Sequence, residues 1–172
     1  MIHTIGHSTL TLDEFTSLLR AHGVTALVDV RRYPASRRQP WFEGAAFAAA
    51  LAGLGIDYRH EVDLGGRRRA RPESPNRAWT NAAFRGFADH MQTPEFAAAL
   101  ERLVAVAQTA STAILCAEAV PWRCHRSLIA DALTVRGIAV DHILGAGPPR
   151  PHRLSPHARI DDAGKLTYPA PA

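Results

Sequence analysis

The residues best suited to chemistry lie in one segment that runs from Cys116 to Arg126, with the sequence Cys-Ala-Glu-Ala-Val-Pro-Trp-Arg-Cys-His-Arg. Cys116 ends an aliphatic run, and the segment leads into a predicted helix that begins near His125. A thiol that faces a helix start beside arginines ionises more readily, because the helix dipole and the positive charges stabilise the thiolate. This pattern predicts that Cys116 is a nucleophile, although a buried structural cysteine would fit the same residues.

The rest of this segment allows several arrangements. Arg123, His125 and Arg126 could bind an anion together with the backbone N–H groups of the helix start. Cys116 and Cys124 could form a redox pair, although they are spaced more widely than the cysteines of redox dithiols. They could also ligate zinc with His125 and Glu118, although zinc ligands usually occur in closely spaced pairs. The simplest interpretation is that Cys124 caps or packs the helix start while His125 and Arg126 face an anionic ligand.

The elements that position these residues follow from the hydrophobic pattern. Short β-rich runs alternate with longer helical runs, which is typical of a mostly parallel sheet flanked by helices. The sequence predicts an α/β fold and a single domain over residues 1–172, with about five strands, at residues 2–5, 24–30, 56–58, 112–116 and 138–144. The proline-rich segment 145–172 is predicted to be irregular, with Ile160 paired with residues 166–168.

Ionisable or nucleophilic side chains follow the predicted strands at their carboxyl ends, where open parallel sheets bind ligands. His7 or Glu118 could transfer a proton to or from Cys116, and His7 follows the first strand together with Ser8. We also predict that the substrate contacts Ser8, Asp29 and Arg31. Because Asp29 and Arg31 project from the same face of their strand, they could instead form a structural salt bridge.

The chain has 172 residues and a formal net charge of +4, and Lys165 is its one lysine, so arginine carries nearly all the positive charge. Arginine-rich residues 67–71 and residues 31–38 predict a cationic rim that binds an anionic small molecule or a nucleotide. A nucleic acid is an alternative partner, because Tyr33, Trp41 and Trp79 could stack on bases. A solvated loop or a GC-rich genome would explain the arginines equally well.

No run approaches the roughly 18 apolar residues that span a bilayer, so no membrane partner is predicted. The first residues lack the pattern of a signal peptide. We therefore expect a cytoplasmic protein whose two cysteines are reduced. Neither a metal nor a cofactor is predicted, and the oligomeric state is left open.

The chain resembles the uncharacterised domain-of-unknown-function (DUF 488) family along nearly its whole length. The matching pieces, in order, are Thr4-Ile-Gly-His-Ser8, Leu27-Val-Asp-Val-Arg31 with Pro34 and Ser36, Leu64-Gly-Gly66, Phe84 with Gly86-Phe87-Ala88, Leu115-Cys-Ala-Glu118 and Cys124-His-Arg126. A weaker resemblance, to rhodanese-like domains, rests on the strand that ends in Arg31 and the strand that ends in Cys116. The turn after Cys116 departs from that pattern, because it is longer and contains Pro121 and a second cysteine.

These observations predict a thiol-dependent transferase or hydrolase that acts on an anionic substrate, such as a nucleotide or a phosphorylated metabolite. Two alternatives remain open. The first is a nucleic-acid-binding or nucleic-acid-processing module that uses the arginine-rich rim. The second is a metal-dependent hydrolase that uses the Cys–His–Glu cluster.

Overall fold

Strand β4 (Thr112–Cys116) lies at the centre of the fold, between β1 (Ile2–Gly6) and β2 (Ala26–Asp29), and pairs in parallel with both. The computed structural model describes residues 1–35 and 37–171, so Ser36 and Ala172 lie outside the described residues. The sheet order is β3-β2-β4-β1-β5-β6. β3 (Asp57–His60) and β5 (Val140–His142) extend it in parallel, and the short β6 (Arg150–Pro151) closes one edge in antiparallel orientation. The predicted α/β fold with a mostly parallel sheet is confirmed.

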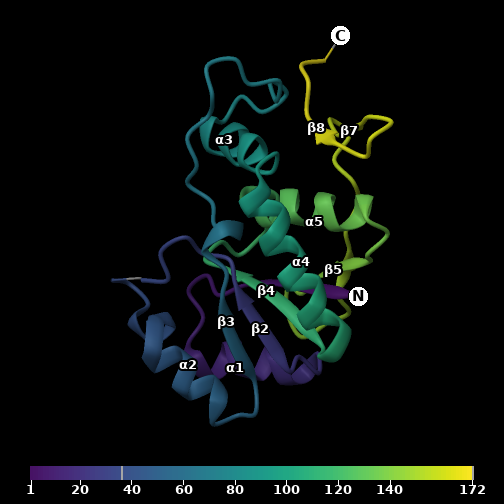
Figure 1. The fold of residues 1–172 in the computed structure, drawn as a ribbon. Coiled ribbons are helices and arrows are strands. Elements are labelled where there is room, and N and C mark those ends of the chain that lie inside the picture. The colour runs from purple at the N-terminus through teal and green to yellow at the C-terminus, as the bar shows by residue number, and fades with distance from the viewer. Residues whose placement is uncertain (36, 172) are drawn as a thin grey trace.

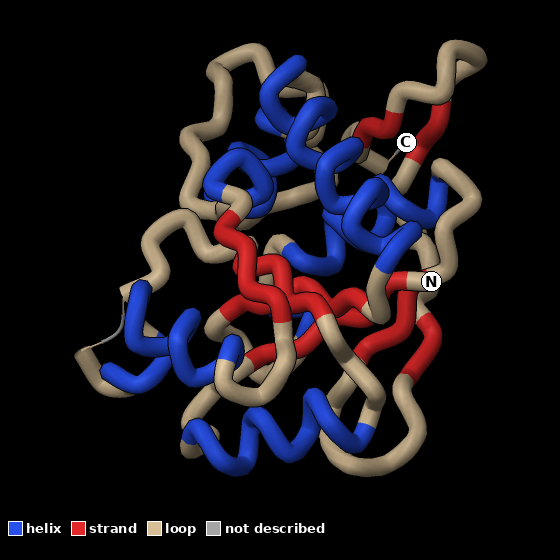
Figure 2. Tube along the Cα trace, turned by 60° about the horizontal axis from the view of Figure 1, so that its bottom comes forward, coloured by secondary structure: helices blue, strands red, loops and turns tan. Residues whose placement is uncertain are grey.

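Helices cover both faces of the sheet (Figures 1 and 2). On one face lie α1 (Leu12–Ala21) and α2 (Gly44–Ala52), and on the other lie α3 (Ala82–His90), α4 (Pro94–Thr109) and α5 (Arg126–Val135). Three 3-10 helices lie in the connections: η1 (Pro40–Phe42), η2 (Val62–Leu64) and η3 (Pro121–Arg123). No helix in the described ranges is both long and apolar enough to cross a membrane.

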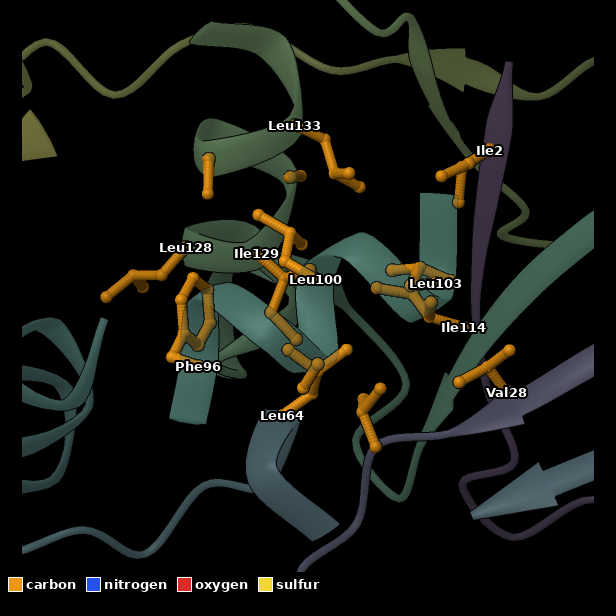
Figure 3. Close-up of a cluster of buried hydrophobic side chains, with 14 of the residues drawn as sticks. Ile2, Val28, Leu64, Phe96, Leu100, Leu103, Ile114, Leu128, Ile129 and Leu133 are labelled. Atoms are coloured by element: carbon orange, nitrogen blue, oxygen red, sulfur yellow. The ribbon is translucent and has the colours of Figure 1, made fainter. Parts of the chain in front are cut away.

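Two hydrophobic cores form because successive strand residues point to opposite faces of the sheet. Ile114 of β4 lies near Leu103 in the core under α4 and α5, and the same core extends to Leu128 (Figure 3). Its neighbour Leu115 packs with Phe15 and the other aromatic residues under α1 and α2. β4 is therefore buried on both faces, as expected for a central parallel strand.

The C-terminal segment is more ordered than predicted. The expected pairing is confirmed by β7 (Arg159–Ile160) and β8 (Leu166–Thr167), and most of residues 145–171 is irregular, as predicted. The segment contributes β6 to the sheet, and it inserts the fully buried Tyr168 beside α5. The hydroxyl of Tyr168 donates a hydrogen bond to Asp131 of α5 at 2.8 Å. The position of β6 and the burial of Tyr168 were not predicted, because neither gives a periodic pattern in the sequence.

A chain of buried side chains ties the C-terminal segment to the sheet. The hydroxyl of Thr4 lies 2.7 Å from Nδ1 of His142, and Nε2 of His142 lies 3.0 Å from Nδ1 of His152. His152 contacts Asp131 through Nε2 at 2.8 Å. Each contact needs one hydrogen, so the chain is satisfied when both imidazole rings are neutral. Burial, together with the charges of nearby basic groups, lowers the pKa of His142 to about 4.

We predict that His142 makes the protein less stable in mild acid. Its pKa is about 4 in the folded protein and about 6.5 in the unfolded chain. The unfolded state therefore binds more protons between these values, and the free energy of unfolding falls as the pH falls from about 6.5 to about 4. His142→Gln should make this fall shallower in urea unfolding at several pH values. The exposed His157→Gln should keep the wild-type slope, and equal slopes for all three proteins would contradict the assignment.

Candidate functional site

A pocket of about 440 Å³ opens where β1, β2 and β4 end. Each of these strands leads into a residue that lines it, namely His7, Arg31 and Cys116. Backbone hydrogen bonds continue past the strands, from the N–H of His7 to the carbonyl of Cys116 at 3.1 Å and from the N–H of Val30 to the carbonyl of Leu115 at 3.0 Å. β4 lies between β1 and β2, although both are distant from it in the sequence, and this arrangement brings the pocket residues together.

Gly6 allows the segment after Cys116 to pass close to the end of β1. A Cβ atom at Gly6 would collide with the carbonyl group of Glu118, and it would lie 3.0 Å from the guanidinium group of Arg126. Arg126 holds the same carbonyl with a hydrogen bond of 2.5 Å. The side chain of Arg126, only 1% exposed, is thus a structural clamp. This differs from its predicted contact with a ligand.

The two cysteines and His125 meet at the floor of the pocket. Nδ1 of His125 lies 3.6 Å from Sγ of Cys124 and 4.0 Å from Sγ of Cys116. Nε2 of His125 donates a hydrogen bond to the carbonyl of Val30 at 2.9 Å. Because Nε2 carries the hydrogen, Nδ1 of the neutral ring presents its lone pair to the sulfur atoms. His125 thus faces the thiols, whereas the sequence analysis expected it to face an anion.

The two sulfur atoms have opposite electrostatic environments. The hydrogen bond to Cys124, together with burial, raises the pKa of the Cys116 thiol. Burial alone would raise the pKa of Cys124, but the hydrogen bond from Cys116 and the charge of Arg126 outweigh it and lower this pKa. Sγ of Cys124 also accepts the backbone N–H of Arg126 at 3.5 Å, in keeping with the expected cap of the helix start. Cys124 therefore has the closer contacts with a base and with a backbone donor, whereas Cys116 was the expected nucleophile.

The predicted salt bridge between Asp29 and Arg31 is confirmed. Arg31 NH2 lies 2.6 Å from the carboxylate of Asp29, and both side chains are buried. Tyr58 adds a hydrogen bond to the same carboxylate at 2.7 Å. Arg31 NH1 lies 3.4 Å from Nε2 of His7, whose Nδ1 contacts the carbonyl of Ser8 at 3.0 Å. The charge of Arg31 is therefore balanced inside the protein, although its guanidinium still lines the pocket.

His7 is poorly suited to the proton-transfer role expected from the sequence. Both ring nitrogens have partners, and burial lowers its pKa to about 4. Its ring stacks on Phe42 with a centroid separation of 4.3 Å, which fixes its orientation. These contacts make His7 a support for Arg31. The carboxylate of Glu118, the other expected proton-transfer group, is exposed and lines the pocket.

The structure separates the remaining predicted substrate-binding residues. Arg123 is exposed and lines the pocket. Asp29 is fully buried behind Arg31 and does not line the pocket. Ser8 lines a different cavity, beside α1, because the chain turns there in the left-handed conformation with φ of 45°. Sequence position alone could not show which way these side chains point.

Other pocket residues come from the loops after β2 and η2. Arg32 and Arg67 line the pocket with Tyr33 and Gly66. From the run at residues 67–71, Arg67 reaches the pocket, whereas Arg68 binds the carbonyl groups of Gly65 and Val62. The number of arginines predicted a cationic rim, but it could not show which arginines line the pocket.

Gly66 leaves space beside the imidazole ring of His125. A Cβ atom at this position would lie 2.8 Å from Nδ1, closer than real Cβ contacts. The donor atoms of Cys116, Cys124 and His125 all lie within 4.8 Å of one another, so these three residues could hold a metal ion. Glu118, which the sequence analysis included among candidate zinc ligands, does not belong to this group.

A family model described as "Domain of unknown function DUF488" matches residues 11–133. The match covers more than half of the chain and includes both cysteines, and the chain therefore belongs to this family. The comparisons with curated proteins and with solved structures found no match. The likeness to rhodanese-like domains stays a prediction.

We predict that Asp29→Asn is far more destabilising than Tyr58→Phe. The first change leaves the buried charge of Arg31 without its anionic partner, which costs about 3–5 kcal/mol in buried ion pairs. The second removes one hydrogen bond to a carboxylate and should cost about 1.5–3 kcal/mol. Urea unfolding of the two variants measures both free energies. Equal effects would show that the charge of Arg31 is balanced by other groups.

Proposed function

We propose that this member of the DUF488 family is an enzyme in which a cysteine sulfur attacks an anionic substrate, in a group transfer or a hydrolysis. The supporting observation is that two sulfur atoms and an imidazole nitrogen lie at the floor of a pocket whose walls carry arginines. Nothing in the family description names an activity, so the proposal rests on this geometry alone.

The arginines support an anionic substrate. Arg31 is neutralised by Asp29, which leaves Arg32, Arg67 and Arg123 to offer positive charge to the pocket. Among the described lining residues, Glu118 is the single carboxylate. Guanidinium groups match the planar oxygen pairs of phosphate and carboxylate groups. An anion in the pocket would thus be held above the sulfur atoms.

Cys124 is the better candidate for the nucleophile, and this revises the role expected for Cys116. Its sulfur accepts the backbone N–H of Arg126 and lies closer to Nδ1 of His125 than the sulfur of Cys116 does, and the contact with a donor and a base favours a thiolate. In the proposed step, Sγ of Cys124 forms a bond to the electrophilic atom of the substrate. The leaving group departs with its electron pair and takes the thiol proton of Cys116. Attack by water or by a second substrate then releases the product and regenerates the cysteine.

A nucleotide fits the pocket for one further reason. Tyr33 is 60% exposed, and the guanidinium of Arg32 lies 5.7 Å from the centre of its ring. The two side chains together offer a surface on which a base could stack, next to the arginines that would hold its phosphates. Nucleic-acid binding stays a prediction, as does the cytoplasmic location.

The test compares two alkylating reagents that differ in charge, iodoacetate and iodoacetamide, on reduced protein kept free of metal by a chelator. The arginines should attract the anionic reagent, so the iodoacetate-to-iodoacetamide rate ratio should exceed that of free cysteine. Arg67→Gln and Arg123→Gln should each lower the ratio about fivefold, because one charge pair at about 4 Å contributes about 1 kcal/mol in water. Arg69→Gln removes the same charge outside the pocket and should leave the ratio unchanged.

Peptide mapping of the alkylated protein identifies the reactive sulfur. Cys124→Ser should abolish the fast modification, whereas Cys116→Ser should retain it because Cys124 keeps its contacts with His125 and with the backbone N–H of Arg126. A rate ratio equal to that of free cysteine, or one that Arg67→Gln and Arg123→Gln leave unchanged, would exclude the anion-selective thiol.

A further inference from the structure

We infer that Cys116, Cys124 and His125 form a binding site for a thiophilic divalent cation, for which Zn²⁺ is the best match. This inference goes beyond the proposed function, because binding of the ion needs neither a substrate nor the arginines of the pocket. Thiolate sulfur and imidazole nitrogen are the ligands that zinc prefers.

The two nitrogen–sulfur distances at this cluster are close to the edge of a zinc tetrahedron. Bond lengths of about 2.3 Å to sulfur and about 2.0–2.1 Å to nitrogen place the two kinds of ligand about 3.6 Å apart. Nδ1 of His125 lies 3.6 Å from Sγ of Cys124 and 4.0 Å from Sγ of Cys116. All three donor atoms lie within 4.8 Å of one another, so one cation could reach them after small side-chain adjustments.

The surrounding hydrogen bonds are those of a preorganised metal site. Histidine ligands usually donate their second ring N–H to a carbonyl or carboxylate group, which orients the ring and fixes its tautomer. His125 does this through Nε2 and the carbonyl of Val30, at 2.9 Å. The backbone N–H of Arg126 approaches Sγ of Cys124 at 3.5 Å and would stabilise a bound thiolate. These contacts orient two of the three donors, His125 and Cys124.

The space and the charge also suit a cation. Gly66 has no side chain beside Nδ1 of His125, where a Cβ atom would come within 2.8 Å of the nitrogen. Two thiolates balance the charge of a divalent ion, and the thiol protons are released to solvent as it binds. All three donors line the pocket, so a water molecule or a substrate in the pocket could supply a fourth ligand.

Metal binding and the proposed thiol chemistry would exclude each other. Both use the lone pairs of the same sulfur atoms, so a bound ion would protect Cys116 and Cys124 from alkylation. Occupancy of the metal site would thus control whether the pocket can perform nucleophilic chemistry.

The test is titration of the full-length, reduced, metal-free protein with Co²⁺, which gives a strong near-ultraviolet absorption when thiolates ligate it. We expect one Co²⁺ per chain, displaced by one equivalent of Zn²⁺. Cys116→Ser, Cys124→Ser and His125→Asn should each weaken binding by at least about 10-fold to 100-fold, the range seen even for outer contacts of metal ligands. His157→Asn, an exposed histidine outside the cluster, should bind like the wild type.

A second variant tests the site without removing a ligand. Gly66→Ala should fold, because no left-handed conformation is required there, but should weaken Co²⁺ binding by pushing His125 aside. Absence of thiolate-to-cobalt absorption in the wild type, or equal affinity in Cys124→Ser, would overturn the inference. Arg67→Gln should leave Co²⁺ binding intact, so a failure of the metal site and a failure of the anion-selective thiol give different results.

Discussion

The hydrogen bond from Nε2 of His125 to the carbonyl of Val30 is the interaction on which the candidate site depends. It links the start of α5 to the residue after β2, and so joins two segments that are distant in sequence. By occupying Nε2, it leaves Nδ1 as the nitrogen that faces Cys116 and Cys124. Without it, the ring could rotate, and the sulfur atoms would lose their neighbouring base.

Much of the framework around this bond could be predicted from the sequence. The aliphatic run that ends at Cys116 identified β4 with its observed bounds. The rule that parallel sheets bind ligands at the carboxyl ends of their strands placed His7, Arg31 and Cys116 at one edge of the sheet. All three residues line the pocket. Hydrophobic patterns and the residues at strand ends are local features, so a single sequence is enough to reveal them.

The roles of single side chains could not be predicted, because they depend on contacts between distant segments. Arg31 and Arg126 look like ligand-binding residues in the sequence, yet one is neutralised by Asp29 and the other holds the carbonyl of Glu118. Cys124 looked like a residue that packs the helix start, and the fold also brings its sulfur near Nδ1 of His125 and near Cys116. The spacing of two residues along the chain does not show whether the fold brings their side chains into contact.

The floor and the walls of the pocket supply separate kinds of chemistry. The floor offers soft sulfur lone pairs and an imidazole nitrogen, whereas the walls offer the delocalised charge of arginines. The thiolates would attract a cation, and the guanidinium groups would repel it. An anion would be attracted by the guanidinium groups and repelled by the thiolates. An anion bound to a metal ion at the cysteines could interact with both groups at once. Its negative charge would pair with the arginines, and one of its lone pairs would coordinate the ion. The same arrangement would bring a substrate anion within reach of Cys124 in the metal-free protein, so the walls can select one class of substrate for either chemistry.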